Sequence, residues 1–320
     1  MLRDSASGKK RKKKKIEMLW TGGWDSSFLL CKLAQEYDEV QPYYIKFGRP
    51  GQKQEIEATE RIMSLLPFHP AIAGKVLPVR MIDSKDINIP KWMYASFESF
   101  HHKYKLGGQW LTIGAFAAQH PGIAVGKVRH YDQPGPLSRL LMEKGHIVFT
   151  SDGVGYLQKN RSDKNVYAVF GNAVYPVANI TELEMKDMAE AWGVTDIMRS
   201  TWFCYYPIDG EPCGTCTPCV MKKLQHMDFL LPVNSQKRFF VRQSLDRLKQ
   251  DSGSKNSEVF DLLIKFRSGM PLKWSTTVDE RQRQKIMLLF QKFISLEALP
   301  LNQLIVVANN AKNINELLDA

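Results

Sequence analysis

Four of the five cysteines in this chain of 320 residues lie in one short segment, at Cys204, Cys213, Cys216 and Cys219. Glycines and prolines between them provide turns, so four thiolates can meet one ion and close every position of a tetrahedral site. Such a metal folds the loop around it and leaves no position for a substrate. Buried free cysteines are the alternative, and an iron–sulfur cluster is the alternative to Zn²⁺. The long gap to Cys204 and the absence of a fourth cysteine followed by proline favour zinc.

The segment after the first apolar run carries a second chemical signal. Residues 16–20 predict a strand, and the apolar side chains of residues 28–33 have helical spacing. Between them stand Thr21, Gly22, Gly23, Trp24, Asp25, Ser26 and Ser27. Glycines let backbone N–H groups approach an anion, a helix start adds its positive end, and serine hydroxyls can donate to phosphate oxygens. Asp25 fits such a loop if it holds Mg²⁺ or orients the loop; the alternative is an ordinary glycine turn capped by Asp25 or Ser26.

Strands and helices alternate through much of the chain. We expect a strand over 42–47, a loop over 48–52, a helix over 55–66 and a strand over 76–82. Further on, the sequence predicts a helix over 110–119, a strand over 123–128, a loop-rich stretch over 130–155 and a strand over 166–169. Thr181 and Glu184 have the spacing of a capping box before a helix that ends near Gly193. This alternation predicts an α/β fold, a doubly wound parallel sheet with ligands at the carboxyl ends of its strands.

Composition divides the chain into three parts. Seven of the charges in the formal net charge of +11 form the run from Lys9 to Lys15, so residues 1–15 are expected to be a disordered basic tail. Nucleic-acid contact or a targeting signal is the other interpretation of that run. Residues 16–235 are expected to form the main domain, and residues 236–320 a helical extension. No stretch approaches the roughly 20 apolar residues of a membrane span, no secretory signal is evident, and the isolated thiol Cys31 fits a reducing compartment, so we expect a cytoplasmic protein.

The glycine segment resembles the Ser-Gly-Gly-X-Asp-Ser signature of the PP-loop ATP pyrophosphatases, with Thr21 in place of the leading serine. Residues 200–205 (Ser-Thr-Trp-Phe-Cys-Tyr) and 213–219 (Cys-Gly-Thr-Cys-Thr-Pro-Cys) resemble one family among them, the 7-cyano-7-deazaguanine synthases. Residues 44–48, the helix from Glu55 and the capping box at Thr181 extend this likeness over residues 16–227.

The resemblance implies that the loop binds the pyrophosphate end of ATP, assisted by Mg²⁺, and that a carboxylate is activated as its adenylate. In that family the acid is 7-carboxy-7-deazaguanine, ammonia displaces AMP, and a second ATP converts the amide to a nitrile. Asp25 and Ser26 would then be catalytic, and ATP would lie against residues 21–27 and against Phe47 and Gly48. A flat deazapurine needs aromatic faces and edge contacts, for which Trp202, Trp110 and Asp132 are the candidates.

The chain also departs from that family. Gly107-Gly108-Gln109-Trp110 stands where the family usually has Gly-Arg-Asn, so a basic contact is missing that Lys105, Lys127 or Arg129 could replace. Residues 49–53 also differ from the usual loop. Family members with extra helices occur in antiphage defence operons, and the extension over 236–320 fits a variant that joins the deazapurine to a protein amine. There are two further alternatives for the function: a tRNA-modifying PP-loop enzyme, and a non-catalytic zinc-bearing module that binds nucleic acid or a partner. The chain could also form a homodimer.

Overall fold

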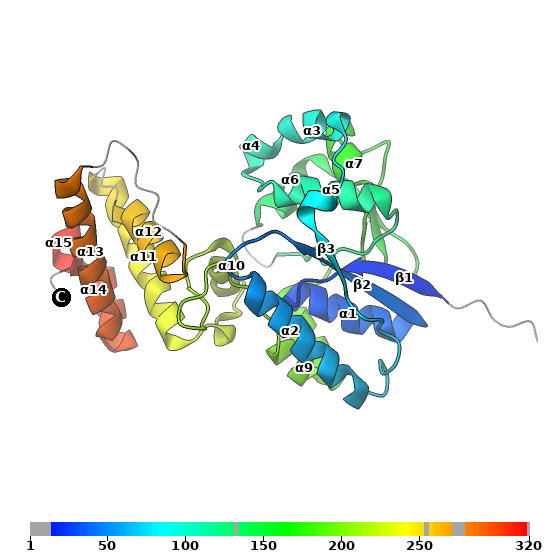
Figure 1. The fold of residues 1–320 in the computed structure, drawn as a ribbon, viewed down its shortest axis with the longest axis horizontal. Helices are drawn as coiled ribbons and strands as arrows, with labels where there is room; N and C mark the ends of the chain where they lie inside the picture. Colours follow the sequence, from blue (N-terminus) through cyan, green and yellow to red (C-terminus); the bar gives the residue numbers. More distant parts are fainter. Residues whose placement is uncertain (1–13, 131–133, 253–255, 271–278, 319–320) are drawn as a thin grey trace, which may run out of the picture.

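The computed structural model describes residues 14–130, 134–252, 256–270 and 279–318. The basic tail up to Lys13 and the candidate substrate residue Asp132 lie outside the described residues. In Figure 1 an α/β body stands beside a group of helices from the end of the chain, with the cysteine segment between the two. None of the described helices is both long enough and apolar enough to cross a bilayer.

Three parallel strands form the first sheet, in the order β1, β2, β3. They are β1 (Lys15–Leu19), β2 (Glu39–Lys46) and β3 (Arg80–Asp83). Ala124 forms parallel bridges to Met18 of β1 on one side and to Val174 on the other, which joins this sheet to a second one. The second sheet is antiparallel and consists of β4 (Ile147–Phe149), β5 (Gly155–Leu157) and β6 (Val174–Tyr175). The expected α/β fold with a parallel sheet is therefore present, and the antiparallel part is an addition that the sequence did not predict.

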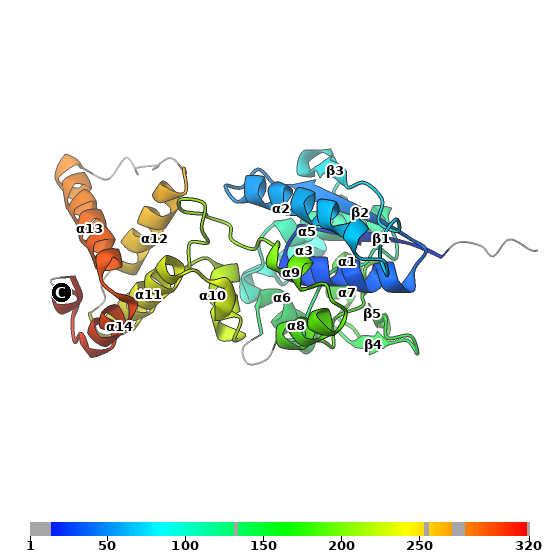
Figure 2. The same cartoon turned by 90° about the horizontal axis from the view of Figure 1, so that it is seen from below.

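Helices cover both faces of the first sheet. Neighbouring residues of β1 point to opposite faces, so each face contributes to a different buried cluster. Met18 and Trp20 belong to one buried cluster, and Leu19 belongs to the other. The first face packs against α1 (Trp24–Glu36), α2 (Gln52–Leu65), α8 (Glu182–Ala191) and α9 (Thr195–Arg199). The second face packs against α3 (Lys91–Glu98), α4 (His101–Tyr104), α5 (Gln109–Gln119), α6 (Pro136–Lys144) and α7 (Lys164–Phe170). Short 3₁₀ turns lie at Leu66–Phe68, Ser84–Asp86 and Asp228–Leu230. Figure 1 shows the two sets of helices on either side of the strands, and Figure 2 shows the same elements from below.

Three of the sequence-based expectations for the middle of the chain differ from the structure. The segment 166–169 is not a strand but part of α7, because the Asp163 carboxylate accepts hydrogen bonds from the N–H groups of Asn165 and Val166 and starts a helix. Its valines are apolar and β-branched, which suits a strand, but Val166 and Val169 are buried on a helix instead. The stretch 130–155, expected to be rich in loops, also contains α6 and β4. The expected strand over 123–128 is reduced to the bridges at Ala124.

The capping box is confirmed. The Thr181 hydroxyl accepts the Glu184 N–H at 3.2 Å, and the Glu184 carboxylate accepts the Thr181 N–H at 2.6 Å, at the start of α8. These bonds satisfy amides that a helix start leaves without partners, and they fix the direction of α8.

The end of the chain is helical, as its periodicity predicts. After α10 (Thr217–Leu224) come α11 (Val233–Ser252), α12 (Asn256–Arg267), α13 (Glu280–Ala298), α14 (Leu301–Asn310) and α15 (Ile314–Leu318). We call α11 to α15 the C-terminal bundle. Its buried side chains, among them Phe260 and Phe293, form one cluster with the four cysteines. The cysteine segment and the bundle therefore share a core.

Candidate functional site

The loop after β1 is packed so closely on α2 that glycine is required at position 22. Gly22 has φ +68, and a Cβ atom there would lie 2.9 Å from the Glu55 carbonyl oxygen. The Gly22 carbonyl accepts the Trp202 N–H at 2.8 Å. The glycine loop is thus held between α2 and the segment that leads to Cys204.

The Ser26 hydroxyl lies at the centre of this loop. Its Oγ is 3.3 Å from the Thr21 N–H nitrogen, from Thr21 Oγ1 and from the Gly23 carbonyl oxygen. All three distances are long for hydrogen bonds of this kind. Thr21 and Ser26 could therefore exchange these contacts for contacts to a ligand at small cost.

Two of the expected loop residues point into the core. The Ser27 hydroxyl is fully buried and accepts the Trp20 indole N–H at 2.9 Å. Trp24 is buried and packs edge-on against Phe229, with ring centroids 6.2 Å apart. Among residues 21–27, three other polar side chains remain at the loop. They are those of Thr21 and Asp25, which are half-exposed, and of Ser26.

The chain passes close to the loop a second time at Gly126. A Cβ atom there would lie 3.1 Å from the backbone nitrogen and Cα of Ser26. Because Ala124 pairs with β1, residues 125–127 emerge beside the loop at the same end of the sheet. The start of α1 therefore has the Gly126 backbone against it.

A charged cluster that the sequence did not reveal borders the loop. The Lys222 ammonium lies 2.6 Å from Glu182 Oε1 and 4.0 Å from Asp25 Oδ1. Asp25 Oδ1 and Glu182 Oε2 are buried and have no hydrogen-bond partner among the described residues. Burial raises the pKa of Asp25 well above its usual value, the Glu182 charge raises it further, and Lys222 opposes the shift. The sequence contained one hint of this cluster: Lys222 lies three residues after Cys219, about one helical turn further along α10.

Two further titratable groups lie near this cluster. Burial lowers the pKa of His130 to about 4, a shift that the charges of Lys127 and Lys222 reinforce and Glu182 opposes. Burial also lowers the pKa of Lys127 to about 8. At neutral pH the imidazole is therefore uncharged, whereas most of the Lys127 population keeps its charge.

Arg49 connects the loop after β2 to α5. Its guanidinium donates to Gln109 Oε1 at 2.9 Å and pairs with the buried Glu55 carboxylate at 2.7 Å. It also lies over the rings of Tyr205 and Phe47, 4.5 and 5.8 Å from their centroids. The glutamine in the Gly-Gly-Gln segment thus meets a guanidinium that comes from the altered 49–53 loop.

The other candidate ligand contacts are placed as follows. Gly48 has φ +68 and its N–H donates to the Gln52 side chain at 2.8 Å. Trp110 is half-buried and lines a small apolar cavity of about 10 Å³ together with Val125 and Phe170. The Trp202 indole N–H donates to the Cys204 carbonyl at 2.8 Å, so this residue joins the glycine loop to the cysteine segment.

A groove at the opposite end of the strands offers no comparable site. It has a volume of about 530 Å³, and Glu17, Gln41 and Arg80 are among its lining residues. The Glu17 carboxylate already accepts from the Tyr43 hydroxyl at 2.8 Å and lies 2.9 Å from the His120 ring nitrogen. Ligands of parallel sheets bind at the carboxyl ends of the strands, which is where the glycine loop lies.

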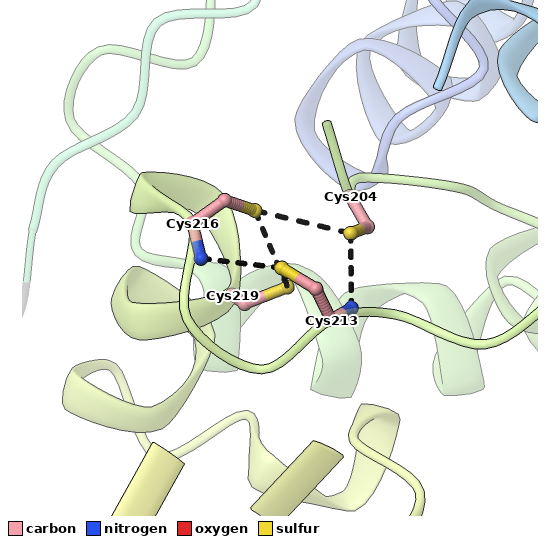
Figure 3. A group of neighbouring side chains, drawn as sticks. All are labelled: Cys204, Cys213, Cys216 and Cys219. Atoms are coloured by element: carbon pink, nitrogen blue, oxygen red, sulfur yellow. Dashed lines mark hydrogen bonds between the residues drawn. The ribbon is translucent and has the colours of Figure 1, made fainter. Parts of the chain in front are cut away.

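The four cysteines converge as one metal-binding group (Figure 3). Their sulfur atoms all lie within 4.8 Å of one another, and the Cys216 sulfur is 3.5 Å from Cys219 and 3.9 Å from Cys204. A tetrahedral zinc site with bonds of about 2.3 Å places its sulfur atoms about 3.8 Å apart. Burial raises the pKa of the Cys204 thiol, so thiolates here need a cation to compensate their charge. The group is therefore suited to a metal ion such as zinc.

The backbone and the bundle hold the cysteine segment in place. The N–H groups of Thr215 and Cys216 point at the Cys213 sulfur, at 3.4 and 3.3 Å. The buried Arg238 guanidinium of α11 donates to the carbonyls of Cys213 and Pro212 at 2.8 and 3.0 Å. The metal-binding group is thus built on bonds from the bundle as well as on its own turns. No protein-family model matches this chain.

Proposed function

We propose that this protein is an ATP-dependent enzyme that activates a carboxylate as its adenylate, with 7-carboxy-7-deazaguanine as the acid and an amine as the second substrate. The observation that carries the proposal is the loop of Thr21 to Ser27. It follows a parallel strand, opens a helix of 13 residues, and has Gly126 and Trp202 against it. A helix start with glycine before it presents backbone N–H groups and a positive dipole end to a phosphate.

The order of the strands supports the same location. β1 has β2 on one side and the Ala124 segment on the other, and both pairings are parallel. The chain therefore changes direction across the sheet at β1, and in doubly wound sheets ligands bind at such a switch point, outside the carboxyl ends of the strands. The loop after β1 and residues 125–127 both lie there.

The residues around the loop fit the chemistry of adenylation. A carboxylate can displace pyrophosphate from the α-phosphate when the negative charge that develops on the leaving group is stabilised. Backbone N–H groups of the loop and the hydroxyls of Thr21 and Ser26 would bind those oxygens. Asp25, with the Glu182 carboxylate beside it, would hold Mg²⁺, which neutralises phosphate charge when bound.

The cysteine group has a separate, structural role in this proposal. Four buried thiolates would hold Zn²⁺ with no open position, so the metal fixes the segment from Cys204 to Cys219 and takes no part in the reaction. Fixing this segment places Trp202 against the loop and Lys222 against Asp25.

A macromolecular amine is the second candidate for the nucleophile. Phe266, Met287, Leu288 and Val306 of the bundle are exposed. Exposed large apolar side chains mark a surface that binds another protein when they form one contiguous patch. An amine carried by such a partner would reach the adenylate in place of ammonia.

The proposal is tested by following the exchange of labelled pyrophosphate into ATP in the presence of Mg²⁺ and 7-carboxy-7-deazaguanine. We expect exchange that depends on the acid, and we expect Ser26→Ala to reduce its rate by about a hundredfold. Ser64→Ala is the matched control, because this exposed hydroxyl lies on α2 and donates only to the Arg61 carbonyl. Mass spectrometry of the products with ammonia then shows whether an amide or a nitrile forms. An absence of acid-dependent exchange in zinc-loaded wild-type protein would refute adenylation of this substrate.

A further inference from the structure

Three basic residues are candidates for the cationic contact at the nucleotide, and their surroundings differ. Lys105 is exposed at the end of α4. Arg129 forms an ion pair with Glu184 at 2.8 Å, and both side chains are about half exposed. Lys127 is half-buried, and its side chain has no hydrogen bond or ion pair with any of the described residues. Of these three residues, only Lys127 is half-buried with no partner for its charge among the described residues.

The backbone places Lys127 beside the loop. Its N–H donates to the Val125 carbonyl at 2.8 Å, which makes a tight turn directly after the segment paired with β1. The residue before it, Gly126, is the one whose added Cβ would lie 3.1 Å from the Ser26 nitrogen. Lys127 is therefore the residue directly after the one that contacts the start of α1.

The neighbouring charges leave Lys127 available for a ligand. Lys222 is held by Glu182 at 2.6 Å and by Asp25 at 4.0 Å, so its charge is already balanced. Burial keeps His130 neutral at pH 7 because its pKa is about 4. A lysine that is partly withdrawn from water without a counter-ion costs free energy, and an anionic ligand would recover that cost.

We propose that Lys127 binds an anionic oxygen of the ligand at the glycine loop. Two sources of that oxygen fit the site, a phosphate of ATP and the carboxylate of the acid substrate. The inference rests on the proposed function, since it assigns a contact within the same site.

The experiment compares Lys127→Gln and Lys127→Arg with wild-type protein by isothermal titration calorimetry. ATP, inorganic pyrophosphate and 7-carboxy-7-deazaguanine are titrated separately, and zinc content and melting temperature are recorded for each protein. Lys105→Gln is the matched control, because it removes the same charge from an exposed position. We expect Lys127→Gln to weaken one class of ligand by about tenfold or more, the loss of a charge-assisted hydrogen bond. Lys127→Arg and Lys105→Gln should stay near wild type.

The ligand that is weakened identifies the source of the oxygen. Weaker ATP and pyrophosphate binding assigns Lys127 to phosphate, and weaker binding of the acid alone assigns it to the carboxylate. Wild-type affinity for ATP should fall by about fivefold between pH 8 and pH 9 if Lys127 binds phosphate, because the lysine loses its proton there, whereas Lys127→Arg should show no such fall. In this range His130 does not change its charge.

Equal affinities of wild type and Lys127→Gln for all three ligands would overturn the inference while leaving the proposed function intact. If the wild-type protein binds none of the three, the proposed function and the inference both fail.

Discussion

The Lys222 ammonium lies 2.6 Å from a Glu182 carboxylate oxygen, and only 6% and 7% of the two side chains are exposed. Lys222 stands on α10, which directly follows Cys216 of the four-cysteine group, and Glu182 is the first residue of α8. This ion pair therefore connects the cysteine segment to the α/β body next to Asp25. A buried ion pair of this kind is sensitive to the loss of either partner, because the remaining charge is left without compensation.

The first prediction concerns this pair. Lys222→Met should reduce the free energy of unfolding by about 3 kcal/mol or more, because the buried Glu182 carboxylate, with Asp25 beside it, is then left without a cation. Adding Glu182→Gln to Lys222→Met should restore part of that loss, since the uncompensated charge of Glu182 is removed. Urea denaturation of the single and double variants measures both effects. Lys186→Met, which removes a surface pair with Glu190, should leave stability close to that of the wild type. Effects of Glu182→Gln and Lys222→Met that simply add would show that the two side chains do not interact.

The second prediction concerns the metal. Protein purified without added metal should contain about one zinc ion per chain, as a closed four-thiolate site requires. Cys204→Ser should lose the metal and lower the melting temperature of the whole C-terminal bundle, because the cysteines and the bundle share one core. Cys31→Ser is the control for metal content, since this thiol lies on α1 in a separate buried cluster of the α/β body. Elemental analysis that finds iron together with inorganic sulfide would exclude zinc as the native metal.

The third prediction concerns Arg238, which holds the metal-binding segment to the bundle. Arg238→Met should cost about 3 kcal/mol of stability, because it leaves the buried Cys213 carbonyl without its donor, removes one of the two donors to the Pro212 carbonyl and breaks the ion pair with Glu297. It should also speed the transfer of zinc to a chromogenic chelator. The exposed Arg281 lies on α13 and serves as the matched control. Zinc release at the wild-type rate would mean that the segment holds its metal independently of the bundle.

The fourth prediction concerns the packing of Gly126 against the loop. Gly126→Ala should lower the rate of acid-dependent pyrophosphate exchange by about tenfold, because a Cβ atom 3.1 Å from the Ser26 nitrogen must displace the start of α1. The fold and zinc content should be kept, as judged by circular dichroism and metal analysis. Gly107→Ala is the control, since a Cβ there meets nothing within 4 Å. If Gly126→Ala has the wild-type rate of pyrophosphate exchange, the loop tolerates the added Cβ atom, and the close packing of Gly126 on Ser26 does not position the nucleotide.

Local patterns were enough to predict several parts of the molecule. The capping box at Thr181 depends on residues three apart and forms as expected. The four cysteines meet because turns lie between them, and β1, the glycine loop and α1 follow one another directly in the chain. By contrast, the valines of 166–169 favour a strand by their side-chain shape, and the Asp163 cap and burial on α7 override that preference.

The sequence by itself determined the parts whose contacts are local: the metal-binding group, the glycine loop at the start of α1, the parallel α/β pattern and the helical end of the chain. Only the tertiary structure decided which distant residues surround the loop. Gly126, Glu182 and Lys222 come from three separate segments, and nothing in their spacing shows that they meet Asp25 and Ser26. The tertiary structure also decided that Arg129 is paired while Lys127 is free among the described residues. The physical reason is that burial and the compensation of charge depend on every element packed around a side chain, and a one-dimensional pattern contains no such information.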